Sequence, residues 1–241
     1  MKDFIQKILR KFGYQFCKYP PLDVRRRLKI VEHHDISLIL DVGANAGQYA
    51  REMRENGYGK KIISFEPLNA AYEKLSQKTR NDINWTAKNF ALGDRNEISK
   101  INISGHSLSS SILDMMPEHL KYAPESDYVD QQEIEIKTLD HIFDSLHQKN
   151  DVIMLKVDTQ GYEQKVIEGA SGSLNKILLL QLEMSLFTLY KGEILISGMM
   201  DLLKDQGFRL ISLENGIYDH QTGELLQTDG IFLNESLKSI D

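Results

Sequence analysis

The sequence predicts an α/β domain built on a mostly parallel sheet of seven strands, with helices on both faces. Two observations carry this prediction. From residue 38 onward, short apolar runs alternate with helical segments, the pattern of a parallel sheet that is covered on both faces. The last two apolar runs flank a turn-rich stretch with Asn215-Gly216 and Thr222-Gly223, which indicates an antiparallel pair.

Each strand follows from an apolar run of suitable length. The strands are expected at residues 38–42, 61–65, 85–92, 152–157, 176–182, 208–213 and 225–233. Within the third run, alternate residues from Trp85 to Ala91 share one face by the period of two. The helices between strands are expected at residues 47–56, 68–79 and 193–206.

Residues 1–37 are expected to form a helical lead-in to the main domain, which spans residues 38–241. The first helix carries one apolar stripe at helical spacing, with its basic residues mostly on the other faces. The stripe consists of Phe4, Ile5, Ile8, Leu9 and Phe12. We expect this helix to pack on the main domain; an interfacial anchor and a dimerisation face are the alternatives.

An insertion separates the third and fourth strands, at about residues 96–148. It holds an expected β-pair, residues 98–103 with 133–137, around a polar loop at residues 104–130. A polar stretch of this length in a compact domain is usually a lid or a disordered segment. The loop is therefore predicted to be a lid.

The composition is that of a globular protein with a net negative charge. The chain has 241 residues, 41% of them hydrophobic, and a formal net charge of −6. This charge argues weakly against a nucleic-acid partner, because binding phosphates needs basic residues. The only cysteine is Cys17, so no intrachain disulfide can form and a reducing, cytoplasmic location is expected. No apolar run approaches the roughly 20 residues of a transmembrane helix.

The sharpest motif is the loop from Asp41 to Gly47, where the first strand ends and a helix begins. Gly43 and Gly47 allow a tight turn and a close approach to a ligand. A dinucleotide fingerprint would carry a glycine where Asn45 stands, and its third glycine falls on Gln48. A methionine carboxylate fits this loop more easily than a pyrophosphate, and Asp41 can then face an ammonium group.

Two further strand ends complete a nucleoside site. Glu66 lies at the end of the second strand, about 25 residues beyond Asp41. This is near the spacing at which a carboxylate binds both ribose hydroxyls. Ala91 and Leu92 end the third strand, where an adenine ring is usually enclosed.

At these motifs the chain resembles the FkbM methyltransferases over about residues 38–235. The resemblance rests on the loop at 41–47, Ser64-Phe65-Glu66-Pro67, Ala91-Leu92-Gly93-Asp94, Ser109-Ser110-Ser111 and the run from Lys156 to Glu163. Many members carry a glutamate where Gln160 stands, so the chain departs from the family there. The resemblance implies a class I Rossmann-like fold, S-adenosylmethionine as methyl donor, and a hydroxyl acceptor, often on a sugar or secondary metabolite.

The reacting groups are expected at the carboxyl ends of the fourth and fifth strands, which selects Asp158 and Glu183. An alcohol benefits from a base that accepts its proton during attack. Asp158 and Glu183 are the predicted catalytic residues, with His106 and His220 as further candidates, and Asp158 is also expected to contact the donor. No metal site is predicted; the alternative is Mg²⁺ held by the two carboxylates.

The sequence thus predicts an S-adenosylmethionine-dependent O-methyltransferase that acts on a hydroxyl of a small molecule or glycan. The sequence allows a homodimer. The competing interpretations are a non-catalytic nucleoside-binding protein and an NAD(P)-dependent oxidoreductase. The asparagine in the loop and the aspartate before it count against the oxidoreductase, while the acids at both strand ends count against a non-catalytic protein.

Overall fold

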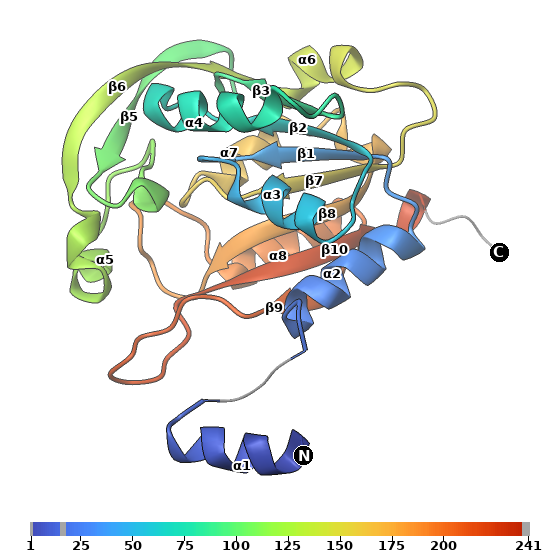
Figure 1. Ribbon diagram of the computed structural model, residues 1–241. Coiled ribbons are helices and arrows are strands. Elements are labelled where there is room, and N and C mark those ends of the chain that lie inside the picture. The colour runs from blue at the N-terminus through green and yellow to red at the C-terminus, as the bar shows by residue number, and fades with distance from the viewer. Residues whose placement is uncertain (1, 15–17, 238–241) are drawn as a thin grey trace. The chain divides into compact units, whose positions relative to one another are not determined.

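The computed structural model describes residues 2–14 and 18–237 (Figure 1). Its internal packing divides the chain into two units, Met1–His34 and Asp35–Asp241. The division falls close to the boundary expected at residue 38. The prediction that concerned Cys17 lies outside the described residues.

The first unit contains two helices, α1 (Lys2–Lys11) and α2 (Leu22–His33), in the segment expected to be helical. Helix α2 begins directly after Pro21, whose fixed φ suits the start of a helix. Across residues 2–14 and 18–237, no helix is long and apolar enough to cross a membrane.

The second unit is built on a seven-stranded sheet in the order β3-β2-β1-β7-β8-β10-β9. Its strands are β1 (Leu38–Val42), β2 (Lys61–Phe65), β3 (Trp85–Lys88), β7 (Ile153–Val157), β8 (Ile177–Ser185), β9 (Phe208–Glu214) and β10 (Gln227–Asn234). The first five in this order pair in parallel, and β10 is antiparallel to both of its neighbours. The predicted α/β fold with an antiparallel terminal strand is confirmed.

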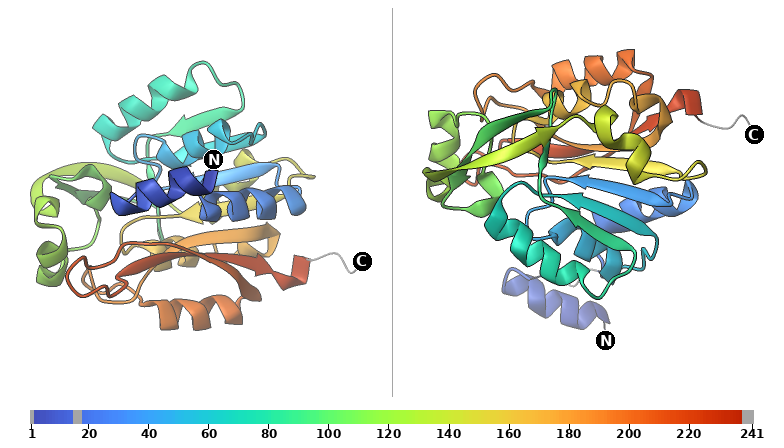
Figure 2. Two further views of the ribbon diagram at one scale, coloured as in Figure 1. Left: turned by 60° about the horizontal axis from the view of Figure 1, so that its bottom comes forward. Right: turned by 90° about the horizontal axis from the view of Figure 1, so that it is seen from above.

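Helices cover both faces of this sheet, as a parallel sheet requires. They are α3 (Gln48–Glu55), α4 (Asn69–Thr79), α6 (Leu139–Leu146), α7 (Glu163–Glu168) and α8 (Ile196–Asp205). The right-hand view of Figure 2 shows α3 and α4 on one face and α8 on the other. Helices α6, α7 and α8 pack on the strands through one buried core residue each, namely Phe143, Val166 and Leu203.

The single strand predicted at residues 85–92 is wrong, because the chain leaves the main sheet after Lys88. The Nδ2 of Asn89 donates to the carbonyl oxygens of Glu66 at 3.0 Å and Pro67 at 3.1 Å. A side chain that bonds the neighbouring backbone in this way competes with the strand ladder. The chain then forms β4 (Ala91–Leu92), which pairs with β6 (Tyr128–Lys137) in a second sheet.

The insertion forms the second sheet, in the order β4-β6-β5. Strand β5 (Glu97–Ser104) pairs antiparallel with β6 (Tyr128–Lys137), which confirms the predicted β-pair. The segment between them contains the short helix α5 (Pro117–Tyr122). This arrangement, visible beside the main sheet in Figure 1, brings residues 104–130 to the edge where β1, β2, β7 and β8 end.

Candidate active site

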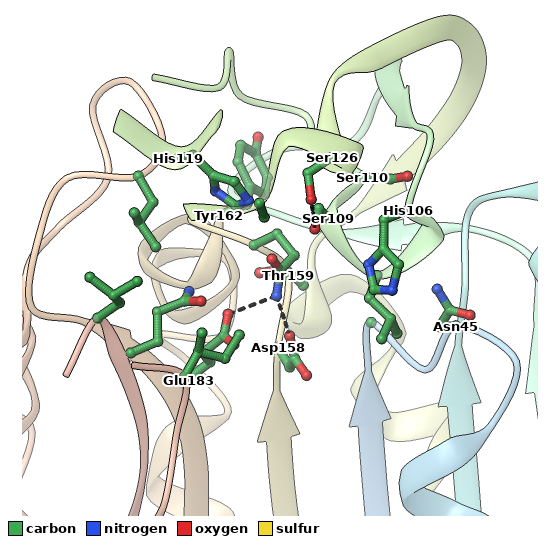
Figure 3. A pocket seen from close by; sticks show the side chains of 18 of the residues that line it. Asn45, His106, Ser109, Ser110, His119, Ser126, Asp158, Thr159, Tyr162 and Glu183 are labelled. Carbon is green, nitrogen blue, oxygen red and sulfur yellow. Dashed lines mark hydrogen bonds between the residues drawn. The ribbon is translucent and has the colours of Figure 1, made fainter. Parts of the chain in front are cut away.

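The functional site is a cavity of about 780 Å³ at the carboxyl ends of the parallel strands, where ligands bind in open α/β sheets. One part is lined by the ends of β1, β2, β7 and β8. Residues within 91–126 and 217–227, together with Leu189, line much of the remainder. Figure 3 shows Asp158 and Glu183 at the base of this cavity, with His106 and His119 facing it from the inserted segment.

The loop after β1 is held in a conformation that glycine favours. Gly43 has φ of 74° and Gly47 has φ of 79°, and between them Asn45 also has a positive φ of 46°. A Cβ on Gly43 would overlap the carbonyl oxygen of Asp158. The missing side chain therefore lets the loop after β1 lie directly against the loop after β7, and Gly43 and Asn45 both line the cavity.

Glu66 lies beneath this loop and is only 4% exposed. Its Oε2 accepts from the backbone N–H of Asn45 at 2.8 Å, and its Oε1 accepts from that of Leu68 at 2.8 Å. Burial raises the pKa of Glu66 to about 7, although both N–H donors oppose this shift. Each oxygen keeps lone pairs for a ligand, so the carboxylate is held in place by the backbone and can accept from a diol in the cavity.

Asp41 does not line the cavity and is fully buried. Its Oδ2 accepts from Ser64 Oγ at 2.9 Å, and its Oδ1 lies 3.3 Å from the Nζ of Lys156. The same ammonium lies 3.5 Å from Oδ2 of Asp158. Burial alone would lower the pKa of Lys156, but the charges of Asp158 and Asp41 raise it. This geometry gives Asp41 a counter-ion within the protein.

The two predicted catalytic acids are linked through Gln160. Its Nε2 donates to Asp158 Oδ1 at 2.9 Å and to Glu183 Oε2 at 2.8 Å (Figure 3, dashed lines). Its Oε1 accepts from the buried hydroxyl of Tyr190 at 2.9 Å. This last bond orients the amide, because the opposite orientation would point an oxygen at two carboxylates. Both amide protons are then used to hold the acids.

Burial is the main reason that the pKa of Glu183 lies well above its ordinary value. The negative charges of Asp158, Glu163 and Asp229 add to this effect, and Lys156 opposes it. Glu183 is partly buried, and only its Oε2 is engaged by Gln160. A carboxylate with a raised pKa and an available oxygen is suited to accept a proton near neutral pH.

Of the remaining residues expected in the site, Ala91, Leu92, His106 and His220 line the cavity. Gly47 and Gln48 do not. A Cβ on Gly47 would approach Leu75 at 2.8 Å and Trp85 at 2.9 Å, so this glycine serves the packing of the loop on its neighbours. Gln48 is exposed.

Sequence reasoning missed three buried residues around the catalytic acids. Oε1 of Glu163 accepts from the backbone N–H of Thr159 at 2.7 Å, which fixes the loop after β7. Tyr190 holds Gln160, and the ring of His119 meets Tyr190 edge-on at 5.2 Å. Burial lowers the pKa of His119, which lines the cavity. Glu163 lies at the end of the run from Lys156 to Glu163 that the sequence singles out, and this was a usable signal for it. Residues 104–130 and 186–195 gave no such signal for His119 and Tyr190.

Within residues 2–14 and 18–237, no cluster of three or more His, Cys, Asp or Glu is arranged to hold a metal ion. The position between Asp158 and Glu183 is taken by the Nε2 of Gln160. A donor nitrogen of an amide cannot coordinate a cation in this orientation.

Comparison with known proteins places this site in a family. Residues 41–210 match the methyltransferase FkbM domain, and no curated protein matches the sequence. Solved structures with a similar fold include Streptococcus pneumoniae Sp1610 in complex with S-adenosyl-L-methionine, at 13% identity over 87% of this chain and 72% of that chain, with a TM-score of 0.44.

Two further structures are similar at comparable levels. The magnesium protoporphyrin IX methyltransferase of Synechocystis PCC 6803 with bound SAM is 10% identical over 97% of this chain and 94% of its own, with a TM-score of 0.45. An rRNA methylase from Streptococcus thermophilus is 12% identical over 85% and 95%, with a TM-score of 0.44. At such identities the similarity concerns the fold alone.

The seven-stranded sheet and the family match define a class I methyltransferase that uses S-adenosylmethionine. The chain belongs to the FkbM methyltransferase family, whose domain covers well over half of its length. The oxidoreductase interpretation is thereby set aside.

Proposed function

We propose that the protein transfers the methyl group of S-adenosylmethionine to a hydroxyl oxygen of a small molecule or glycan. The observation that carries this proposal is the pair of carboxylates, Asp158 and Glu183, that Gln160 holds together in the cavity. An alcohol is a weak nucleophile, so a fixed proton acceptor beside it is the feature that O-methylation needs most.

The donor is expected in the part of the cavity formed by the loop after β1 and the ends of β2 and β7. Gly43 and Asn45 would lie along its methionine moiety, Glu66 would accept from both ribose hydroxyls, and Ala91 and Leu92 would contact the adenine. When bound, S-adenosylmethionine supplies an electrophilic methyl group on a sulfonium. Asp158 completes this end of the cavity as a donor contact.

Glu183 is the better candidate for the base, and Asp158 for a binding role. Oδ1 of Asp158 accepts from Gln160, and its Oδ2 faces the Lys156 ammonium. Glu183 has one oxygen on Gln160 and the other available within the cavity. In the reaction, the O–H bond of the acceptor breaks and its proton passes to Glu183. The acceptor oxygen bonds to the methyl carbon as the bond from that carbon to sulfur breaks, and S-adenosylhomocysteine is the leaving group.

The charges around the cavity favour a neutral acceptor over a polyanion. Among the described residues that line the cavity, Lys121 is the single Lys or Arg, and five are acids: Glu66, Glu125, Asp158, Glu183 and Asp219. Phosphate-rich acceptors such as nucleic acids would meet unfavourable charge here. A cytoplasmic location is part of the same proposal and rests on the composition of the sequence; the oligomeric state is not part of it.

The test is product analysis with a methyl-deuterated donor. The protein is incubated with this donor and a panel of neutral sugars, glycans and hydroxylated metabolites, and products are identified by mass spectrometry with fragmentation. We expect a deuterated methyl on an oxygen of one acceptor class, lost in Glu183→Gln. A label found only on nitrogen or carbon would refute O-methylation while leaving the family assignment intact.

A further inference from the structure

We propose that helix α1 binds the surface of an anionic lipid membrane. The proposal concerns residues 2–14 and does not depend on which acceptor is methylated. Phe4, Ile8 and Phe12 recur at four-residue intervals, so they share one side of the helix and its end. Ile5 and Leu9 widen this side into a continuous apolar face.

This apolar face is open to solvent. Phe4 is 68% exposed and Phe12 is 73% exposed, and Ile5 and Ile8 are exposed as well. Tyr14, directly after the helix, is also exposed. Single exposed apolar residues are ordinary, but a contiguous group marks a surface that binds something. Aromatic rings with one polar end, such as that of Tyr14, suit the boundary between lipid and water.

The charge of the helix selects an anionic surface. Residues 2–11 contain four basic residues and one acid, a formal charge of +3, whereas the whole chain carries −6. By helical spacing, Lys7 and Lys11 lie beside Phe4 at one margin of the apolar face. Their methylene stems can lie along the lipid while the ammonium groups reach the headgroups. Each such residue strengthens binding to an anionic surface about fivefold.

A second copy of the helix fits this face less well. Antiparallel pairing of two such faces would place Lys7 and Lys11 of both copies along the same margin, where like charges repel. A helix of ten residues is also only marginally stable alone in water. A membrane surface supplies both the apolar contact and the opposite charge, and α1 is far shorter than the roughly 20 residues needed to span the bilayer.

The test uses the full chain in a vesicle flotation assay. Vesicles of phosphatidylcholine alone are compared with vesicles that also contain phosphatidylglycerol. We expect flotation with the anionic vesicles, weaker flotation as salt increases, and little with the neutral ones. Phe4→Ser combined with Ile8→Ser should reduce binding at least about tenfold, because binding scales with buried apolar area.

Two control variants separate the helix from the rest of the surface. Ile83→Ser removes an isoleucine that is 99% exposed in the other unit, and it should leave flotation unchanged. Lys7→Gln with Lys11→Gln should weaken binding to anionic vesicles about 25-fold, which is about fivefold for each residue. Lys149→Gln, at another exposed lysine, should not.

Four outcomes would overturn the proposal. The first is no flotation with anionic vesicles, and the second is flotation that the serine variant leaves undiminished. The third is a dimer in sedimentation equilibrium that the serine variant dissociates, without lipid binding, which would assign the face to a second copy. The fourth is a lower Tm of the serine variant without lipid binding, which would show that the face packs on the protein itself.

Discussion

The Nε2 of Gln160 donates to Oε2 of Glu183 at 2.8 Å. Gln160 is uncharged, whereas many members of the family that the chain resembles carry a glutamate at this position. A glutamate here would add a third carboxylate beside Asp158 and Glu183. One of the three would then have to hold a proton. The glutamine instead donates to both acids and lets them stay close together.

Replacing Gln160 should therefore shift the pH profile of the reaction. In Gln160→Leu, Glu183 loses a donor to its charged form, so its pKa, already raised mainly by burial, rises further. The base works only when ionised, so the rising limb of kcat against pH should move to higher pH, and kcat at pH 7 should fall about tenfold. Gln164→Leu, a matched change on α7, should leave the profile in place. An unshifted limb in Gln160→Leu would show that the bond does not tune the base.

Kinetic and binding measurements should distinguish the roles of Glu183 and Asp158. Glu183→Gln should lower kcat by about 10²–10⁴ with donor affinity nearly unchanged, the usual weight of a general base. Asp158→Asn should instead weaken donor binding, because it removes a charge that faces Lys156 at 3.5 Å. Single-turnover rates and calorimetry with S-adenosylhomocysteine measure the two effects. A full-rate Glu183→Gln enzyme would transfer the base role to Asp158 or a histidine.

Donor binding should depend on pH through Glu66. Its pKa is raised to about 7, mainly by burial, and the ribose hydroxyls bind best to the ionised carboxylate. Affinity for S-adenosylhomocysteine should therefore be highest above pH 7 and fall as the pH decreases through that value. Glu66→Gln should bind about tenfold more weakly and lose this pH dependence.

Glu163→Gln is the control for this titration. The pKa of Glu163 is also raised to about 7 by burial, but this residue does not line the cavity. The variant should keep the pH dependence of binding. If Glu163→Gln abolished that dependence and Glu66→Gln did not, the titrating group would be misassigned.

Most of the fold followed from local patterns, because strands buried on both faces leave unbroken apolar runs. Strands β1 and β2 begin and end at the expected residues. The break after Lys88 could not be seen, because it depends on a bond from Asn89 to the backbone of a neighbouring strand. Similarly, α8 begins at Ile196 instead of residue 193, since Glu193 accepts from the N–H of Tyr190 and closes a turn.

In the site, too, some residues could be predicted from local patterns and others could not. Residues at strand ends, such as Glu66 and Glu183, could be placed from the order of the strands, and both line the cavity. The burial of Asp41 against Lys156 could not, because it depends on which side of the strand each residue faces. The link through Gln160 required side-chain orientations that spacing alone does not define.

Gly43 should tolerate no side chain, because the backbone of the loop after β7 lies directly against it. An added Cβ would overlap the Asp158 carbonyl oxygen, and φ is 74°. Gly43→Ala should lower the stability by about 1–3 kcal/mol and the Tm by roughly 2–4 °C per kcal/mol. Donor binding should also weaken as the loop after β7 shifts. Gly59→Ala, where a Cβ meets nothing within 4 Å, is the control. Equal Tm values for the two variants would contradict this packing.

The inserted segment at residues 104–130 is expected to act as a lid over the cavity. Ser111 Oγ donates to the carbonyl of Gln160 at 2.6 Å, and Met115 forms a bridge with Tyr190. These contacts tie the first half of the segment to the site. Lys121, on α5, is exposed at the rim of the cavity.

Limited trypsin digestion tests this expectation at Lys121. A ligand that orders the segment lowers the population of open states that a protease can cut. Cleavage after Lys121 should therefore slow at least about fivefold with S-adenosylhomocysteine plus acceptor, whereas cleavage after the exposed Lys149 should keep its rate. Equal rates at Lys121 with and without ligands would show a permanently ordered flap. Slowing at both lysines would show only that the ligands stabilise the whole domain, and the lid prediction would fail.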